Sequence, residues 1–93
     1  MTTKISLDSD ENLDYTFDYS RVLEADTIQS STWTKTQGDT NLNVLSPSFT
    51  TNTTTIWLSG GRLGSIYKVT NHVVMTPSGR EFDRTLLVKI VEK

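Results

Sequence analysis

The acidic stretch Asp8–Asp14 is the part of the sequence whose residue types come closest to a metal-binding set. Its oxygen-bearing side chains stand at alternate positions from Asp8 to Asn12, the spacing that calcium-binding loops use. An EF-hand loop also needs a glycine at its sixth position and a glutamate at its twelfth, where this sequence has Leu13 and Tyr19. We interpret the stretch as a solvated acidic turn, with a weak cation site as the alternative. We expect no cofactor.

Residues that could support catalysis are too few and too scattered to form an active site. His72 is the only histidine, and no Gly-x-Ser-x-Gly turn offers it a nucleophile. Asp14 and Asp18 would lie about 13 Å apart along one strand, which exceeds the separation of a glycosidase carboxyl pair. The glycine-rich run 60–64 lacks the Lys-Ser/Thr of a phosphate-binding loop. We therefore predict that the protein is not an enzyme.

The composition indicates one small domain that folds without disulfides. The chain has 93 residues and no cysteine, so neither disulfides nor zinc–thiolate sites are available. The first seven residues lack the apolar core of a signal peptide, and no apolar stretch approaches the roughly 20 residues of a membrane span. These features favour a protein made in a reducing cytoplasm, with no membrane contact.

The charges are unevenly distributed along the chain. Residues 1–26 carry seven acids and two bases, whereas residues 60–93 carry six bases and three acids. The bases alternate with other residues instead of clustering, and the isoelectric point of about 5.2 is low, so a nucleic-acid partner is disfavoured. The two oppositely charged segments would meet either as neighbouring strands of one fold or between neighbouring copies. The sequence leaves both open.

Most of the chain has the two-residue periodicity of β-strands. The clearest case is Leu13–Tyr19, where apolar and polar residues alternate, and Gly or Pro turns separate the segments. The sequence of Ser20–Ala25 allows at most one helical turn. Leu86–Val91 fits either a helix or a strand, and its β-branched residues favour a strand. The predicted strands are Leu13–Tyr19, Thr27–Lys35, Leu42–Ser46 (ended by Pro47), Thr53–Ser59, Ile66–Met75 and Arg80–Glu92.

Six or seven such strands without a helix to cover them predict two stacked sheets. We therefore expect an all-β sandwich of the immunoglobulin-like or fibronectin-III-like kind. We expect residues 13–93 to form this domain and residues 1–12 to be a polar segment that could be flexible. Thr76-Pro77-Ser78-Gly79 is predicted as the turn of the last hairpin.

The segment Gly64-Ser65-Ile66-Tyr67-Lys68-Val69 looks like the start of the penultimate strand of immunoglobulin-like domains. In those domains a tyrosine fills the end of the sandwich and its hydroxyl bonds back to the preceding turn. Tyr67 is our candidate for this tyrosine corner, with its hydroxyl expected on a buried carbonyl. The sequence departs from the commoner versions in having no Asp or Leu at the usual place and no cysteine afterwards.

Four segments of the sequence, 13–19, 26–33, 57–61 and 78–86, form a wider pattern. This pattern resembles a family of small tailed-bacteriophage proteins described as fiber–tail adaptor proteins. The resemblance runs from about Leu13 to the C-terminus. It implies an immunoglobulin-like virion component, present in several symmetric copies, that bridges the tail or neck to fibres.

The side chains of greatest interest divide into a predicted core and predicted interface positions. Trp33 is our choice for the buried tryptophan of such a sandwich. Trp57 is out of phase with Ile56 and Leu58, so it is either core or an outward contact residue. The predicted core residues are Tyr67, Trp33, Tyr15, Phe17, Val69, Leu86 and Val88. The candidate interface residues are Trp57, Arg62, Arg80 and Arg84.

The hypothesis that follows is a non-enzymatic virion protein, made in the host cytoplasm, that joins tail, neck or fibre proteins by protein–protein contacts. Its partners would be those proteins and copies of itself, with neither nucleic acid nor membrane. The alternative is a carbohydrate- or cell-surface-binding module on the same fold, with Trp57, Tyr15 or Tyr19 as the platform for a sugar ring.

Overall fold

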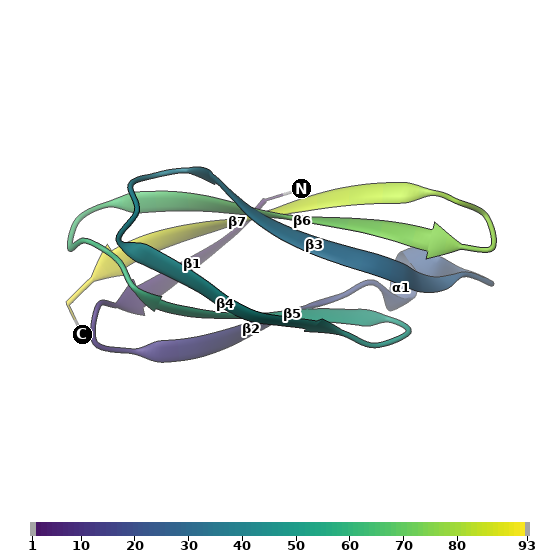
Figure 1. Cartoon of the computed structure of the whole chain (residues 1–93), viewed down its shortest axis with the longest axis horizontal. Coiled ribbons are helices and arrows are strands. Elements are labelled where there is room, and N and C mark those ends of the chain that lie inside the picture. The colour runs from purple at the N-terminus through teal and green to yellow at the C-terminus, as the bar shows by residue number, and fades with distance from the viewer. Residues whose placement is uncertain (1, 93) are drawn as a thin grey trace.

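The computed structural model describes residues 2–92, which form seven strands and one short helix. The strands lie in two layers around a shared core (Figure 1). The ends of the predicted ranges 1–12 and 13–93, Met1 and Lys93, lie outside the described residues. The elements are β1 (Thr2–Asp8), β2 (Asn12–Asp18), α1 (Ser20–Leu23), β3 (Thr27–Gln37), β4 (Leu42–Phe49), β5 (Thr53–Gly60), β6 (Ile66–Thr76) and β7 (Glu81–Val91).

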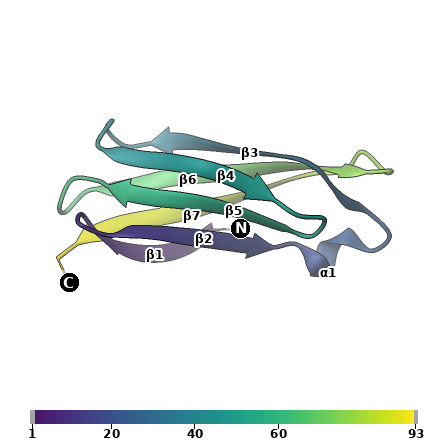
Figure 2. The same cartoon turned by 60° about the horizontal axis from the view of Figure 1, so that its bottom comes forward.

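The two layers are a four-stranded sheet in the order β1-β7-β6-β3 and a three-stranded sheet in the order β2-β5-β4 (Figure 2). Neighbouring strands pair antiparallel except β1 and β7, which run parallel. This arrangement confirms the predicted all-β sandwich. Strands β3, β6 and β7 facing β2, β5 and β4 are compatible with the immunoglobulin-like order, in which C, F and G face B, E and D.

The N-terminal strand extends the sandwich beyond the boundary predicted at Leu13. Thr2–Asp8 pairs along its whole length with β7. Its side chains alternate between the two faces of the sheet, so that Leu7 is fully buried and Ile5 packs against the core. The segment 1–12, for which the sequence predicts no strand, therefore contains an edge strand of the larger sheet.

Strand β4 continues through Pro47, where the sequence predicts its end. The register with β5 shifts between Leu45 and Ser48, and Ser46 has a φ of 50°. Because β4 is an edge strand, a proline at such a bulge breaks no ladder hydrogen bond that the sheet needs. The prediction of a strand end was wrong because it assumed a central strand.

The core fills the space between the layers with side chains from alternate strand positions. On β6 the inward residues Tyr67, Val69, Val73 and Met75 have no exposed surface. On β7 the same alternation buries three residues and leaves their neighbours on the outer face, so the C-terminal segment is a strand. The buried apolar residues are Leu7, Phe17, Tyr19, Leu23, Ile28, Leu42, Ile56, Leu58, Tyr67, Val69, Val73, Met75, Leu86, Val88 and Ile90.

The single helical turn α1 connects the two sheets at the end where β2 leaves for β3 (Figure 2). It buries Leu23 and has no side-chain hydrogen bond at its N-terminus. Within residues 2–92, no helix is long and apolar enough to cross a membrane.

Candidate interaction surfaces

Tyr67 closes the end of the sandwich where β5 turns into β6. Its ring is fully buried against Gly38, at which an added Cβ would lie 2.2 Å from the ring. The Arg62 backbone N–H donates to the Tyr67 hydroxyl oxygen (3.0 Å), and this hydroxyl donates to Asp39 Oδ1 (2.6 Å). The hydroxyl thus bonds back to the turn, as a tyrosine corner does, but it bonds to an N–H and a carboxylate where the sequence predicts a carbonyl.

Tyr67 and Asp39 each shift the pKa of the other. The hydroxyl of Tyr67 is the main cause that lowers the pKa of Asp39, and the backbone N–H of Asn41 adds to it. Burial is the main cause that raises the pKa of Tyr67, and Asp39 raises it further. The corner therefore consists of a neutral phenol and an ionised carboxylate at neutral pH.

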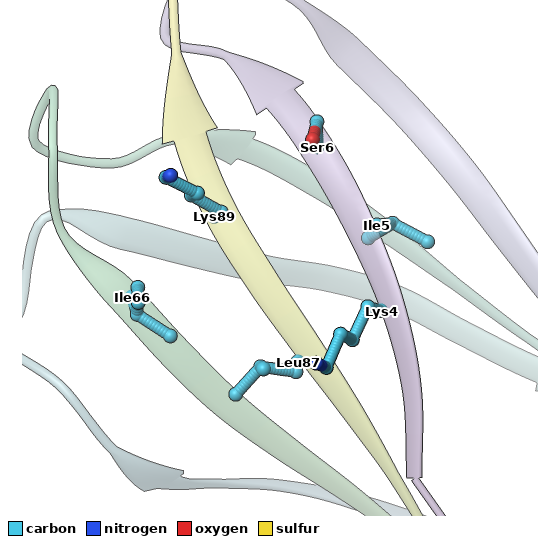
Figure 3. A pocket seen from close by; sticks show the side chains of 6 residues that line it. All are labelled: Lys4, Ile5, Ser6, Ile66, Leu87 and Lys89. Carbon is cyan, nitrogen blue, oxygen red and sulfur yellow. The ribbon is translucent and has the colours of Figure 1, made fainter.

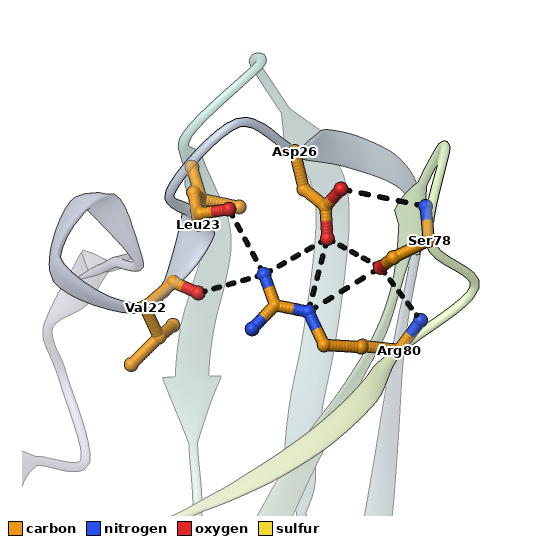
Figure 4. Close-up of polar contacts among 5 residues, drawn as sticks. All are labelled: Val22, Leu23, Asp26, Ser78 and Arg80. Carbon is orange, nitrogen blue, oxygen red and sulfur yellow. Dashed lines mark hydrogen bonds and ion pairs between the residues drawn. The ribbon is translucent and has the colours of Figure 1, made fainter.

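Arg80, a candidate interface residue, closes the opposite end of the sandwich through contacts within the chain. Figure 4 shows its guanidinium between Asp26 and the last carbonyls of α1. Its Nη2 lies 2.9 Å from Asp26 Oδ2 and also donates to the carbonyl oxygens of Val22 (3.1 Å) and Leu23 (2.9 Å). An arginine at this position bonds to the last carbonyls of the helix, of which that of Leu23 also accepts from the Asp26 backbone N–H. We call Asp26, Ser78 and Arg80 the hairpin clasp.

Asp26 accepts hydrogen bonds from both other members of the hairpin clasp. The Ser78 hydroxyl donates to Asp26 Oδ2, and Arg80 donates through both Nε and Nη2. The Ser78 hydroxyl is the main cause that lowers the pKa of Asp26, and Arg80 lowers it further. The Asp26 side chain is 7% exposed and that of Arg80 is 38% exposed, so the pair is only partly shielded from water.

Arg84, another candidate interface residue, also makes contacts within the chain. Its guanidinium lies 4.2 Å from the centroid of the Tyr19 ring, and Nη1 donates to the carbonyl oxygen of Asp18 (3.1 Å). Of the three arginines predicted for an interface, only Arg62 has a side chain on the exposed surface of a loop.

A buried asparagine links the two layers at the middle of the core. Asn71 has no exposed surface, and its Oδ1 accepts from the hydroxyls of Tyr19 and Thr54, both at 2.9 Å. Its Nδ2 donates to Ser31 Oγ (2.9 Å) and to the Thr32 carbonyl oxygen (3.2 Å). Sequence reasoning missed this residue, although it stands in phase with the inward residues of β6.

The residues predicted for the core lie in or against it. Trp33 is half-buried on the edge strand β3, where its ring stacks on Phe17 with centroids 5.5 Å apart and planes 4° apart. Tyr15 is also half-buried and meets Phe17 edge to face. The buried members of the predicted set are Phe17, Tyr67, Val69, Leu86 and Val88.

Trp57 lies on the outer face of the three-stranded sheet, at its centre. It is 38% exposed and pairs across the ladders with Leu45 on β4 and with Asp14 on β2. Leu45 is 44% exposed, so the two apolar side chains form one patch. Next to them the hydroxyls of Thr16 and Thr55 share a hydrogen bond (2.8 Å). We call Asp14, Thr16, Leu45, Thr55 and Trp57 the tryptophan face.

The outer face of the four-stranded sheet is charged, and its two halves have opposite sign. Near the start of β6, a shallow groove runs over β1, β7 and β6, with Ile66 44% exposed beside lysines (Figure 3). Within residues 2–92, no carboxylate forms an ion pair with Lys4, Lys68 or Lys89. The groove is lined by Lys4, Ile5, Ser6, Ile66, Leu87 and Lys89.

The other half of that face is acidic and holds the only histidine. His72 Nδ1 lies 2.6 Å from Asp83 Oδ1, and Nε2 lies 2.8 Å from Glu81 Oε1. Asp83 first and Glu81 second raise the pKa of His72. All three side chains are exposed, and no nucleophile hydrogen-bonds to the ring within the described part of the chain, so the geometry is that of a surface ion cluster.

The acidic stretch Asp8–Asp14 forms the turn between β1 and β2. Oδ1 of Asp8 accepts from the backbone N–H of Asp10 (2.9 Å), and Oε1 of Glu11 accepts from the backbone N–H of Asp8 (2.8 Å). These carboxylates hold the turn together, and residues 2–92 contain no group of three ligating side chains that could hold a metal ion.

The family model described as "Podophage GP4 fiber-tail adaptor protein gp77" matches residues 7–89, which include the whole three-stranded sheet and the four-stranded sheet without most of β1 and the end of β7. No curated protein matches the chain.

Proposed function

Because the chain belongs to the podophage fiber-tail adaptor family, we propose that it joins a fibre to the tail by protein–protein contacts alone. The family makes it a structural protein of the phage tail. The proposal adds that no catalysis takes part and that one outer face of the sandwich carries the contact with a tail or fibre protein.

The observation that carries the proposal is the tryptophan face. A tryptophan 38% exposed at the centre of a sheet, with an exposed leucine beside it, leaves apolar surface in water that a partner would bury. Aromatic residues with a polar rim are typical of the centre of protein interfaces. Here Asp14, Thr16 and Thr55 supply the rim.

Mutation of Trp57 tests this proposal directly. In a binding assay between the purified chain and the purified tail and fibre proteins of the same phage, Trp57→Ala should weaken binding to one of them by about a hundredfold. Phe49→Ala is the matched control, because Phe49 is 46% exposed but pairs with the inward residue Thr54 on β5. Equal affinities for the wild type and Trp57→Ala would contradict the tryptophan face as the contact.

The carbohydrate-binding alternative is supported by Trp57 alone. Tyr19 has no exposed surface, and Tyr15 packs against Phe17, so neither ring offers a free face to a sugar. A glycan array would distinguish the two functions: saccharide binding that Trp57→Ala abolishes would favour the carbohydrate-binding module over the adaptor contact.

A further inference from the structure

The four-stranded sheet has an outer face whose pattern is complementary to itself. Along β7 the outward residues run from Glu81 and Asp83 through Thr85 to Leu87 and Lys89. Along the strand the face therefore changes from acidic through uncharged to basic.

Strand β6 runs antiparallel beside β7 and contributes no acidic residue to this outer face. Its outward residues pair with those of β7: Val74 with Glu81, His72 with Asp83, Thr70 with Thr85, Lys68 with Leu87 and Ile66 with Lys89. The Thr70 and Thr85 hydroxyls hydrogen-bond to each other (3.1 Å) and mark the centre of the face.

A two-fold axis in the plane of this face, across the strands at Thr85, superposes unlike charges on β7. Glu81 and Lys89 lie equally far from Thr85 on either side, so Glu81 of one copy would face Lys89 of the second copy, twice in the dimer. Asp83 would face Leu87, whose neighbours across the sheet are Lys4 on β1 and Lys68 on β6. On β6, Val74 would face Ile66, which is 44% exposed in the single chain. His72, which Glu81 and Asp83 already pair within its own chain, would face Lys68.

We propose that this face is the contact of a symmetric homodimer, in which two copies stack their four-stranded sheets with the β7 strands antiparallel. Isologous interfaces of this kind require a self-complementary patch, and unlike charges fix their register. The molecule is 42 Å long and 19 Å wide, so one side presents about 800 Å², which is what each partner of a standard complex buries. The tryptophan face lies on the other sheet and stays free for a different protein.

Charge reversal tests the dimer through its symmetry. Sedimentation equilibrium of the wild-type chain should show a dimer at low salt that weakens at about 0.5 M NaCl, where charges are screened. Lys89→Glu and Glu81→Lys, each alone, should raise the dimer dissociation constant by at least about tenfold, since each places like charges opposite one another twice. An equimolar mixture of the two variants should form a heterodimer as tight as the wild-type dimer, since both pairs are restored.

The mixture also guards against misfolding, because a variant that had lost its fold would not regain affinity on mixing. Asp14→Lys is the matched control, an exposed acid reversed on the other sheet, and should leave the dimer unchanged. A monomer at concentrations up to about 1 mM at low salt would overturn the proposal, as would Lys89→Glu with wild-type affinity or a mixture that stays monomeric. The proposed adaptor contact is tested separately, by the binding of the Trp57→Ala variant to tail and fibre proteins.

Discussion

The two ends of the sandwich are each closed by an aspartate that accepts hydrogen bonds from a distant part of the chain, but the donors differ in kind. At one end Asp39 accepts from the phenol of Tyr67, which is fully buried. At the other end Asp26 accepts from the guanidinium of Arg80, which is 38% exposed. The first end is stabilised mainly by the packing of a buried ring, with a hydrogen bond in addition. The second end is stabilised mainly by an ion pair.

This difference implies that the two ends respond to different perturbations. A buried ring on a glycine tolerates no change of volume, because close-packed surroundings cannot move aside. A half-exposed ion pair tolerates changes of volume but is weakened by salt. The end with the hairpin clasp should therefore be the more adaptable end of the molecule.

Gly38→Ala should have the largest effect, a loss of about 3 kcal/mol in the free energy of unfolding. An added Cβ would lie 2.2 Å from the Tyr67 ring, and Gly38 has a φ of 119°. Gly79→Ala is the control: its φ is 79°, but nothing lies within 4 Å of its added Cβ. Urea unfolding should show about 1 kcal/mol for this variant. Equal losses in both would show that the ring contact contributes nothing.

Tyr67→Phe should lower the free energy of unfolding by about 1–2 kcal/mol, because the Arg62 N–H loses its acceptor and Asp39 its donor while the ring stays. The loss should be the same at low and high salt, since no ion pair is broken. A loss of stability that disappears in high salt would show that the Tyr67 end, like the Arg80 end, depends on charge.

Arg80→Met should lower Tm by about 5 °C at low salt, because it keeps an apolar stem beside Phe82 but removes the pair with Asp26. The difference from the wild type should shrink as NaCl is added, since screening weakens the pair in the wild type. Thermal unfolding at several salt concentrations measures this. A salt-independent difference would show that the carbonyl contacts, not the charge, hold the hairpin.

The smallest effect is expected from acid. The pKa of Asp26 and that of Asp39 are both lowered in the folded chain. Their contributions to stability are therefore present above the unfolded pKa of about 3.9 and are lost as the pH falls through the lower folded values. Asp26→Asn and Asp39→Asn should each differ from the wild type in Tm at about pH 5 and approach it near pH 2. A difference in Tm between variant and wild type that grows towards low pH would contradict the lowered pKa of that aspartate.

Much of the architecture is predictable because strand periodicity is local. The alternation in Leu13–Tyr19 and Ile66–Met75 identifies strands and their inward faces, and two such faces without a helix require a second sheet. Trp57 follows the same logic, since its position out of phase with Ile56 and Leu58 leaves an outward tryptophan as one of two readings. Tyr67 is found from the turn that precedes it.

The strand Thr2–Asp8 was not predictable in the same way. Its pattern is short and its residues are polar, and its stability comes from parallel pairing with the last strand of the chain. The strand end predicted at Pro47 was wrong for a related reason, because only the sheet order shows that this strand lies at an edge.

The sequence by itself determined most of the strands, the turns between them and the inward aromatic residues, because each depends on neighbours a few residues away. Only the tertiary structure decided which groups meet: Arg80 with Asp26, Tyr67 with Asp39, and Asn71 with donors and acceptors from three other strands or strand ends. It also decided which charged side chains of β6 and β7 lie side by side on the outer face. Partners separated by tens of residues are chosen by sheet order and register, which no local pattern encodes.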